Sequence, residues 1–461
     1  MSLLKSAGIY VFGSFFVQGL SFITLPIFSA LMPPEDYGLY ASYSFWIVLS
    51  NAIIGLQAAS SVNNAYVDYG KDRIYSYAFA TTPIAIFSFL PIGLICLLCS
   101  GPVTSLLELP LIAVMLGLVQ SLLTYFFNTL LNVYRIEDKP VRYLLLSVVN
   151  ASVGVFGSIV LLLLDTGLQP YATRVVSSLV AALLTGGFSL FILSVKSRMR
   201  FNGSYVRYAV KLTSPLVFHA LAGMMLARIN QMLLLNMINS AEAGVYAYAS
   251  NYGQVVSTLF TACNAAFVPW FYRSLSEGGS KTDRNVVIKG YVGAFSLGAC
   301  AYVLLCPIVV STLSPESYAG ASKVSSVVSF SFLLNFLYSI PANYEFYQKK
   351  TKYIAVGTVA ACVVDIALCL LLIPPFSSMG AAFSSLIAYT FLFCGHSFIV
   401  SGVLKIKEYV GARAFLPWIL LGLVVTAIAL SPANTWLGAV IGLILIGLAF
   451  FKIIRISKRF G

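Results

Sequence analysis

The chain has 461 residues, of which 59% are hydrophobic and only 9% charged, and its formal net charge at pH 7 is +13. Soluble domains carry about 25% charged residues, so this composition excludes a water-soluble globular protein. The excess positive charge lies in short segments between apolar stretches. It is therefore expected beside anionic lipid headgroups and does not indicate a nucleic-acid partner.

About fourteen apolar stretches follow one another along the chain. Each is long enough to cross the roughly 30 Å apolar core of a bilayer as a helix. Because a spanning segment must satisfy its backbone polar groups internally, we predict an all-α membrane protein. The predicted spans are 8–32, 40–62, 76–100, 109–133, 143–164, 170–195, 213–237, 243–270, 286–313, 319–344, 353–373, 379–403, 412–431 and 433–454.

Basic residues fall on one side of these spans. Of the 28 Lys and Arg residues, 25 lie in alternate gaps, from Lys5 to Arg459. Cytoplasmic loops of membrane proteins collect Lys and Arg, so we predict that both chain ends are cytoplasmic. The opposite gaps carry acids such as Glu35 and Glu108. No gap exceeds about twenty residues, which leaves no room for an extramembrane domain.

An internal repeat divides the chain. Residues 35–41 resemble residues 241–247, and residues 134–143 resemble residues 344–353. Six predicted spans separate the two copies, which indicates two parallel-repeat six-helix bundles around a central cleft, a transporter architecture. The predicted organisation is an N-terminal bundle at 1–195, a cytoplasmic linker at 196–212, a second bundle at 213–403, and two extra helices with a basic tail at 404–461.

Several short patterns resemble a known family. They include Ser6-Ala7-Gly8-Ile9-Tyr10, Pro34-Glu35-Asp36-Tyr37-Gly38, Ala227-Arg228-Ile229-Asn230, Phe267-Val268-Pro269-Trp270-Phe271 and Gly380-Ala381-Ala382. These segments resemble bacterial polysaccharide flippases, the O-antigen and exopolysaccharide exporters of the multidrug/oligosaccharidyl-lipid/polysaccharide superfamily. The resemblance covers the first twelve predicted helices. In that family Asp often stands where this chain has Ala227, and Asn where it has Asp365.

The resemblance implies a function. Such a protein flips undecaprenyl-pyrophosphate-linked oligosaccharide repeat units from the inner to the outer leaflet of the bacterial cytoplasmic membrane by alternating access. The expected partners are this lipid-linked glycan, membrane lipids and the polysaccharide polymerase machinery. The alternative is an ion-coupled multidrug or small-molecule exporter of the same superfamily. Nothing in the chain resembles a nucleotide-binding loop, a catalytic triad or a metal cluster, so we predict a non-enzyme without a cofactor.

Two charges lie near the middle of predicted spans. Arg228 is seventeen residues from Lys211 and twelve from Ser240. An Arg at that depth costs about 3 kcal/mol on insertion scales unless it faces water or a partner. We interpret it either as a lumen cation that attracts pyrophosphate or as one half of an ion pair with Asp365. Asp365 is either that partner or a carrier of a proton or Na⁺.

Four other residues are weaker candidates for charge coupling or substrate contact. His219 is nine residues from Arg228 and so on the opposite helix face, where a buried, hydrogen-bonded role is the alternative. His396 is likewise interpreted either as a charge-coupling residue or as a buried, hydrogen-bonded side chain. Arg174 and Lys323 lie near the outer ends of their spans, where each either anchors the helix by snorkelling or binds substrate.

Polar side chains also recur at helical spacing within spans. Such stripes suit sugar hydroxyls, although the same residues also hold helices together. The stripes are Ser14, Gln18 and Ser21; Gln120, Thr124 and Asn128; Asn251, Gln254, Thr258 and Thr261; and Ser331, Asn335 and Tyr338. From these and from the Arg228 face we predict Gln18, Gln231, Asn251, Gln254, Asn335 and Tyr338 as substrate-binding residues.

Overall fold

The computed structural model describes residues 3–164, 166–198, 201–277, 280–431 and 434–460. These residues form helices and short connections, with no strand among them. Eleven helices are long and apolar enough to cross a membrane, and two shorter apolar helices span Phe15–Leu31 and Leu416–Leu430. The predicted all-α membrane class is therefore confirmed.

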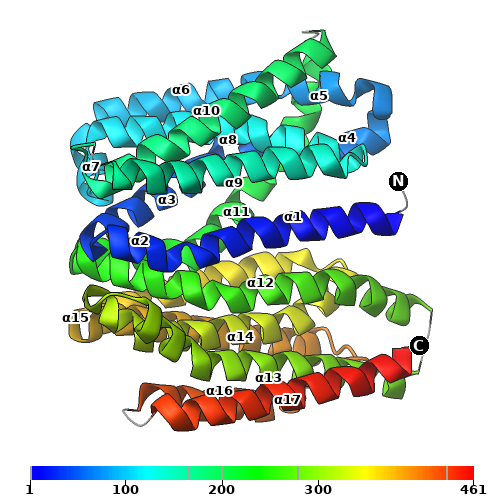
Figure 1. The fold of residues 1–461 in the computed structure, drawn as a ribbon. Coiled ribbons are helices and arrows are strands. Elements are labelled where there is room, and N and C mark those ends of the chain that lie inside the picture. Colours follow the sequence, from blue (N-terminus) through cyan, green and yellow to red (C-terminus); the bar gives the residue numbers. More distant parts are fainter. Residues whose placement is uncertain (1–2, 165, 199–200, 278–279, 432–433, 461) are drawn as a thin grey trace. The chain divides into compact units, whose positions relative to one another are not determined.

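Two compact units make up the chain, Met1–Arg228 and Ile229–Gly461. The predicted linker at 196–212 includes the start of α11, which begins at Gly203, so the predicted domain bounds stay predictions. Figure 1 labels the helices in chain order.

The first unit is built around three long neighbouring helices. In Figure 1, α8 packs against α10 and α10 against α9, while α1 lies along α9. The elements are α1 (Leu3–Ile23), α2 (Leu25–Leu31), α3 (Pro34–Ile53), η1 (Ile54–Ser61), α4 (Val62–Tyr69), η2 (Lys71–Arg73), α5 (Ile74–Ala80), α6 (Thr82–Leu98), α7 (Ser100–Leu107), α8 (Leu111–Ile136), α9 (Pro140–Leu163) and α10 (Pro170–Ser197). The unit ends within α11 (Gly203–Met237).

The second unit has α14 at its centre, packed against α12, α13 and α15, with α16 and α17 against α13. Most of α14 is buried, which explains why its sequence is apolar or small on nearly every face. The elements are α12 (Ser240–Ser276), α13 (Lys281–Leu313), η3 (Glu316–Tyr318), α14 (Ala319–Tyr347), α15 (Thr351–Phe398), the π-turn η4 (Ile399–Val403), η5 (Ala412–Ala414), α16 (Leu416–Leu430) and α17 (Asn434–Phe460).

The long helix α15 is a hairpin of two antiparallel arms. Ser377 breaks it with φ 48° and ψ −131°, two residues after Pro375 of the Pro374-Pro375 pair. Cys369 Sγ lies 2.8 Å from Ser384 Oγ, close to the turn, and His396 packs beside Gly357, farther from it. The two arms therefore run antiparallel and stay in contact along their length. The arms match the predicted spans 353–373 and 379–403, which the sequence separated by this Pro-containing turn.

The predicted span 40–62 is broken in its middle. After α3 ends, Gly55, Leu56 and Gln57 have φ values of 76°, 50° and 60°, and a helix restarts at Val62. Left-handed backbone at non-Gly residues costs of order 1–3 kcal/mol each and is found mainly where surrounding contacts enforce it. Here the Gly55 N–H donates to Ser88 Oγ at 2.9 Å, which satisfies one backbone group that the break releases.

Gly55→Ala is expected to lower the free energy of unfolding by about 2–4 kcal/mol, because Ala disfavours positive φ and crowds a packed ring. A Cβ at this position would lie 2.2 Å from the Tyr125 ring. The measurement is the apparent Tm of the purified protein in detergent. Gly101→Ala is the matched control, since its Cβ meets nothing within 4 Å and the change should be neutral or stabilising. An unchanged Tm for Gly55→Ala would contradict the proposed packing.

Candidate functional site

A polar pocket of about 250 Å³ lies in the first unit, where the broken helix faces α8. Its walls come from α3, η1, α8 and the start of α9, all within the first unit. Amide, hydroxyl and guanidinium groups dominate the lining, although the helices that supply it are apolar enough to cross a membrane. The lining residues are Asn51, Ile54, Gln57, Ala59, Ser60, Tyr125, Asn128, Leu131, Asn132, Arg135 and Tyr143.

Three amides of the polar pocket donate to main-chain carbonyls. Asn132 Nδ2 donates to Ala59 O at 2.9 Å, and Gln57 Nε2 donates to Ala52 O at 3.1 Å. Asn51 Nδ2 donates to Ser121 O at 3.1 Å. A side-chain amide has two donors and an oxygen with two lone pairs, so these bonds leave the oxygen atoms as acceptors. Acceptor-rich amides are suited to the hydroxyl donors of a sugar.

Asn128 and Arg135 complete the polar lining. Asn128 is half buried and makes no hydrogen bond within the described part of the chain. Its amide is therefore available to a ligand. Arg135 Nη2 donates to Tyr143 Oη at 3.0 Å, and its guanidinium lies 5.3 Å from the centre of the same ring. A guanidinium has five N–H donors, so most remain available for an anion. The pocket therefore combines acceptors with a positive charge at one edge.

The turn between α8 and α9 is held by a charged network. Glu137 Oε2 accepts from Lys139 Nζ and from Tyr75 Oη, each at 2.6 Å. Burial raises the pKa of Glu137, but the hydrogen bonds from Lys139 and Tyr75 and the positive charges of Lys139 and Lys196 lower it by more, so the pKa of Glu137 lies below its ordinary value. The carboxylate thus contributes stability above its unfolded pKa, and the contribution is lost as pH falls through the lower folded pKa.

Arg174 lies in an aromatic cage of the first unit. Its guanidinium is 3.8 Å from the centre of the Phe28 ring and 3.9 Å from that of Tyr40. No carboxylate lies within 4.0 Å of it in the described residues, and its buried Nε–H has no partner there. Stacking between two rings stabilises the cation by about 1–2 kcal/mol. Arg174 can therefore also hold α10 against α2 and α3, a third role beside the predicted anchoring and substrate binding.

Asp365 lies at the centre of a buried polar cluster in the second unit. It is 0% exposed, and its Oδ1 accepts from Asn230 Nδ2 at 3.3 Å. The same Asn230 nitrogen lies 2.9–3.3 Å from four further acceptors: Cys369 Sγ, Ala381 O, Ser384 Oγ and Ser385 Oγ. Two N–H donors cannot satisfy five acceptors, and Asp365 Oδ2 has no partner among the described residues. The cluster thus has acceptor capacity for a proton or a small cation.

His396 forms a buried pair with a residue that the sequence analysis did not single out. Its Nδ1 lies 2.7 Å from Glu345 Oε1, and the two side chains are 1% and 0% exposed. The Tyr338 ring packs 4.9 Å from the imidazole, centre to centre, and Gly357 leaves space for the ring. His396 and Tyr338, predicted for different roles, are therefore neighbours. Glu345 could have been suspected as a carboxylate inside the second copy of the 134–143 repeat.

Other predicted residues are placed separately. Gln231 is buried, and its Oε1 lacks a partner within the described residues, whereas Gln18 is exposed on α1. Arg228 is half buried and belongs to the first unit, and Asp365 to the second, so their pairing stays a prediction. Asn251, Gln254 and Asn335 are half buried on α12 and α14. The side chain of His219 lies outside the described residues.

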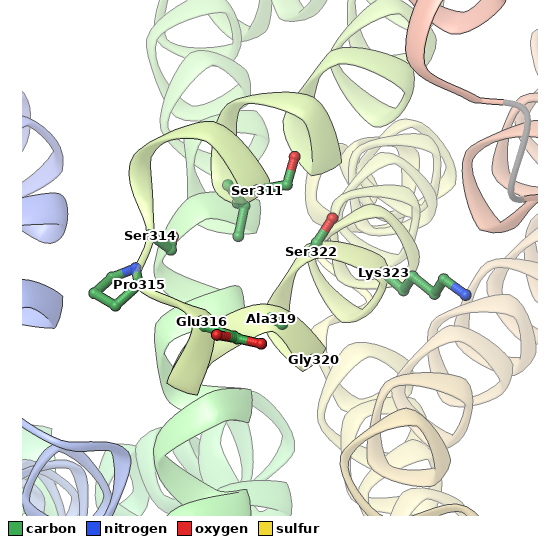
Figure 2. Close-up of a pocket in the computed structure, with 9 residues that line it drawn as sticks. Ser311, Ser314, Pro315, Glu316, Ala319, Gly320, Ser322 and Lys323 are labelled. Carbon is green, nitrogen blue, oxygen red and sulfur yellow. The ribbon is translucent and has the colours of Figure 1, made fainter.

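Lys323 lines an open pocket where α13 turns into α14, shown in Figure 2. The Glu316 carboxylate lies across this pocket and the Lys323 chain points outward from it. Ser311, Ser314 and Ser322 line the same pocket, but Ser322 Oγ donates to Pro307 O and Ser311 Oγ to Ile308 O. Most of its lining residues, Lys323 among them, are exposed, and the predicted substrate role of Lys323 stays a prediction.

Most residues of the polar pocket were missed as candidates. Yet the predicted stripe of Gln120, Thr124 and Asn128 continues along α8 to Asn132 and Arg135 at the same helical spacing. Extending that stripe would have found the α8 wall. Nothing in the sequence marks Gln57, because its contribution depends on the left-handed break of the helix.

Comparison with known proteins places the chain in a family. The model of the family described as "Polysaccharide biosynthesis protein" matches residues 3–275. The chain belongs to this family. A relative from Haemophilus influenzae, "Lsg locus putative protein 1", is 23% identical over 389 residues, covering 80% of this chain and 90% of the relative. A second relative from that organism, "Uncharacterized membrane protein", is 22% identical over 384 residues, covering 79% and 89%.

Solved structures show the same fold. The lipid II flippase MurJ in an inward closed conformation is similar, with a TM-score of 0.70 and 15% identity, over 97% of this chain and 98% of that one. An inward-facing multidrug resistance MATE transporter of the MOP superfamily has a TM-score of 0.67 and 12% identity, over 85% and 96%. The family match confirms the predicted polysaccharide-biosynthesis family, and the solved structures share the all-helical fold of this chain.

Proposed function

We propose that this protein flips polyprenyl-pyrophosphate-linked oligosaccharides across the bacterial cytoplasmic membrane by alternating access. The observation that carries the proposal is the polar pocket of the first unit, with its amide oxygens and the Arg135 guanidinium. A sugar head offers hydroxyl donors to the amides, and its pyrophosphate offers an anion to the guanidinium.

A flippase must offset the cost of moving a polar head through an apolar layer. A neutral polar group loses roughly 2–7 kcal/mol when it leaves water without a new hydrogen bond. The polar pocket offers replacements for such bonds, and one of its walls is a broken helix, a feature that transporters with discontinuous helices use to build binding sites. This supports a hydrophilic substrate.

Energy for transport is proposed to enter through the Asp365 cluster of the second unit. The buried carboxylate, with Asn230, Ser384 and Ser385 around it, can take up a proton or Na⁺. One charge moved across 100 mV is worth about 2.3 kcal/mol, which is enough to bias a transport cycle. Both chain ends and the basic loops are proposed to face the cytoplasm, following the distribution of Lys and Arg.

Multidrug export is the second candidate, because the fold is shared with a multidrug transporter. Sites for drug-sized molecules are lined predominantly by hydrophobic and aromatic side chains. The polar pocket is lined mainly by amides, hydroxyls and one guanidinium, which favours a sugar over an apolar drug. Restoration of surface glycan and resistance to cationic drugs distinguish the two functions.

The test uses a bacterial strain that lacks its own polysaccharide flippase. Expression of this chain is expected to restore surface glycan and to deplete the lipid-linked repeat units retained inside. Asn128→Leu and Arg135→Gln should each reduce restoration about tenfold, since each removes a hydrogen bond to a charged or polar head worth about 1.5 kcal/mol. Arg228→Ala tests the predicted lumen cation in parallel.

Arg73→Gln is the matched control, since Arg73 is an exposed basic residue outside the polar pocket. It should export like the unmodified chain at equal membrane levels. No restoration in several glycan backgrounds, together with resistance to cationic drugs, would replace the flippase proposal by multidrug export.

A further inference from the structure

An apolar groove of about 490 Å³ lies on the first unit between α9 and α10, over α8. We call it the α9–α10 groove. Leu145 and Val149 on α9 and Leu184 and Phe188 on α10 line it, and each is 45–59% exposed. The lining hydroxyl of Thr185 is already bonded to Asn150 Oδ1 and Ala181 O, so it adds little polarity. The groove is therefore suited to a hydrocarbon chain.

One end of the α9–α10 groove is basic. Arg142 and Lys196 line that end, both are exposed, and Arg142 has no carboxylate within 4.0 Å in the described residues. Lys196 Nζ is held 3.1 Å from Tyr75 Oη and 4.5 Å from the centre of that ring. Leu184 and Lys196 are twelve residues apart, so the groove runs about 18 Å along α10. That length is close to one leaflet of a roughly 30 Å apolar core.

The same helix turn joins the α9–α10 groove to the polar pocket. Tyr134 lines the groove, and the next residue, Arg135, lines the polar pocket. On the other side of the turn, Arg142 lines the groove and Tyr143 lines the polar pocket. Neighbouring residues on a helix point about 100° apart, which explains how one turn serves two sites. An apolar groove, a basic turn and a polar pocket thus adjoin within one unit.

We propose that this arrangement is a docking site for the inner-leaflet form of the substrate, with the polyprenyl tail in the α9–α10 groove, the pyrophosphate at the basic turn between Arg135 of the polar pocket and Arg142 and Lys196 of the groove, and the first sugar in the polar pocket. The proposal rests on the proposed function. Lipid tails are as apolar as the groove, so the groove alone does not select its ligand, and the basic end must do so. An ordinary phospholipid has no sugar for the polar pocket, which favours the lipid-linked glycan.

The test measures binding of radiolabelled undecaprenyl pyrophosphate that carries a single N-acetylhexosamine to the purified full chain in phosphatidylcholine nanodiscs. Arg142→Gln should weaken binding about fivefold, the usual contribution of one basic residue near a membrane surface. Leu184→Trp fills the groove and should weaken binding to a similar extent. The matched controls are Arg73→Gln and Leu163→Trp, which change an exposed basic and an exposed apolar residue outside the groove. Both should bind within twofold of the unmodified chain.

The binding and export results together decide between the docking site and the proposed function. Binding unchanged by both Arg142→Gln and Leu184→Trp, in proteins with an unaltered apparent Tm, overturns the docking site. Displacement of the probe by an equal concentration of phosphatidylglycerol also overturns it, because the groove would then hold any anionic lipid. If the unmodified chain exports glycan but binds the probe independently of the groove, only this inference fails. If binding depends on the groove while the chain restores no surface glycan, only the proposed function fails.

Discussion

Replacing Asp365 by Asn is expected to reduce glycan export by about tenfold or more while leaving the protein folded. A neutral amide of the same shape can neither take up a proton nor neutralise a bound cation, so the coupling step is lost. The substitution should also raise stability by about 0.5–2 kcal/mol, a common result when a strained functional site is neutralised. The buried carboxylate with its unpartnered Oδ2 is the strained group here.

The measurements are surface glycan in the flippase-deficient strain and apparent Tm of the purified protein. A Tm that rises with Na⁺ in the unmodified protein, but not in Asp365→Asn, would identify Na⁺ as the coupling ion, since a ligand stabilises the state that binds it. Loss of export without a Na⁺ effect, but with a changed pH dependence of export, would identify a proton. Asp72→Asn, at an exposed position, is the matched control. Full export by Asp365→Asn would exclude Asp365 from coupling.

Glu345→Ala is expected to have the largest effect on stability, lowering the free energy of unfolding by about 3–5 kcal/mol. Removing one partner of a buried pair leaves the other desolvated and unpaired. His396 would remain with its Nδ1 facing a cavity, and its Nε2 already has no partner within the described residues. Thermal unfolding of the purified variant measures this loss.

A double-mutant cycle separates the pair from simple cavity formation. Glu345→Ala combined with His396→Leu should recover part of the lost stability, because no unpaired polar group is then buried. Glu277→Ala, which removes an exposed carboxylate of the same unit, should leave the Tm within about 1 °C, as surface substitutions usually do. A strictly additive cycle, or a loss below about 1 kcal/mol for Glu345→Ala, would show that the pair contributes little.

Whether a candidate site could be predicted from the sequence depends on how far apart in the sequence its residues lie. The polar α8 wall of the polar pocket, from Asn128 through Asn132 to Arg135, continues the helical stripe that begins at Gln120 and was predictable in principle. By contrast, Asn230 and Asp365 are 135 residues apart, and Glu345 and His396 are 51 apart. No local pattern could pair these residues, because each pairing depends on which helix faces pack together. Arg174 shows the same limit, since Phe28 and Tyr40 come from two other helices.

The sequence by itself determined the class of this protein, an all-α chain with many membrane-spanning helices. Apolar length and the placement of Lys and Arg act segment by segment, because each span must satisfy its own backbone in the bilayer. Only the tertiary structure decided that span 40–62 breaks at Gly55, Leu56 and Gln57, and that α8, α9 and α10 enclose a groove beside a polar pocket. These features arise from contacts between helices, such as the Tyr125 ring against Gly55, which hydropathy along the chain does not encode.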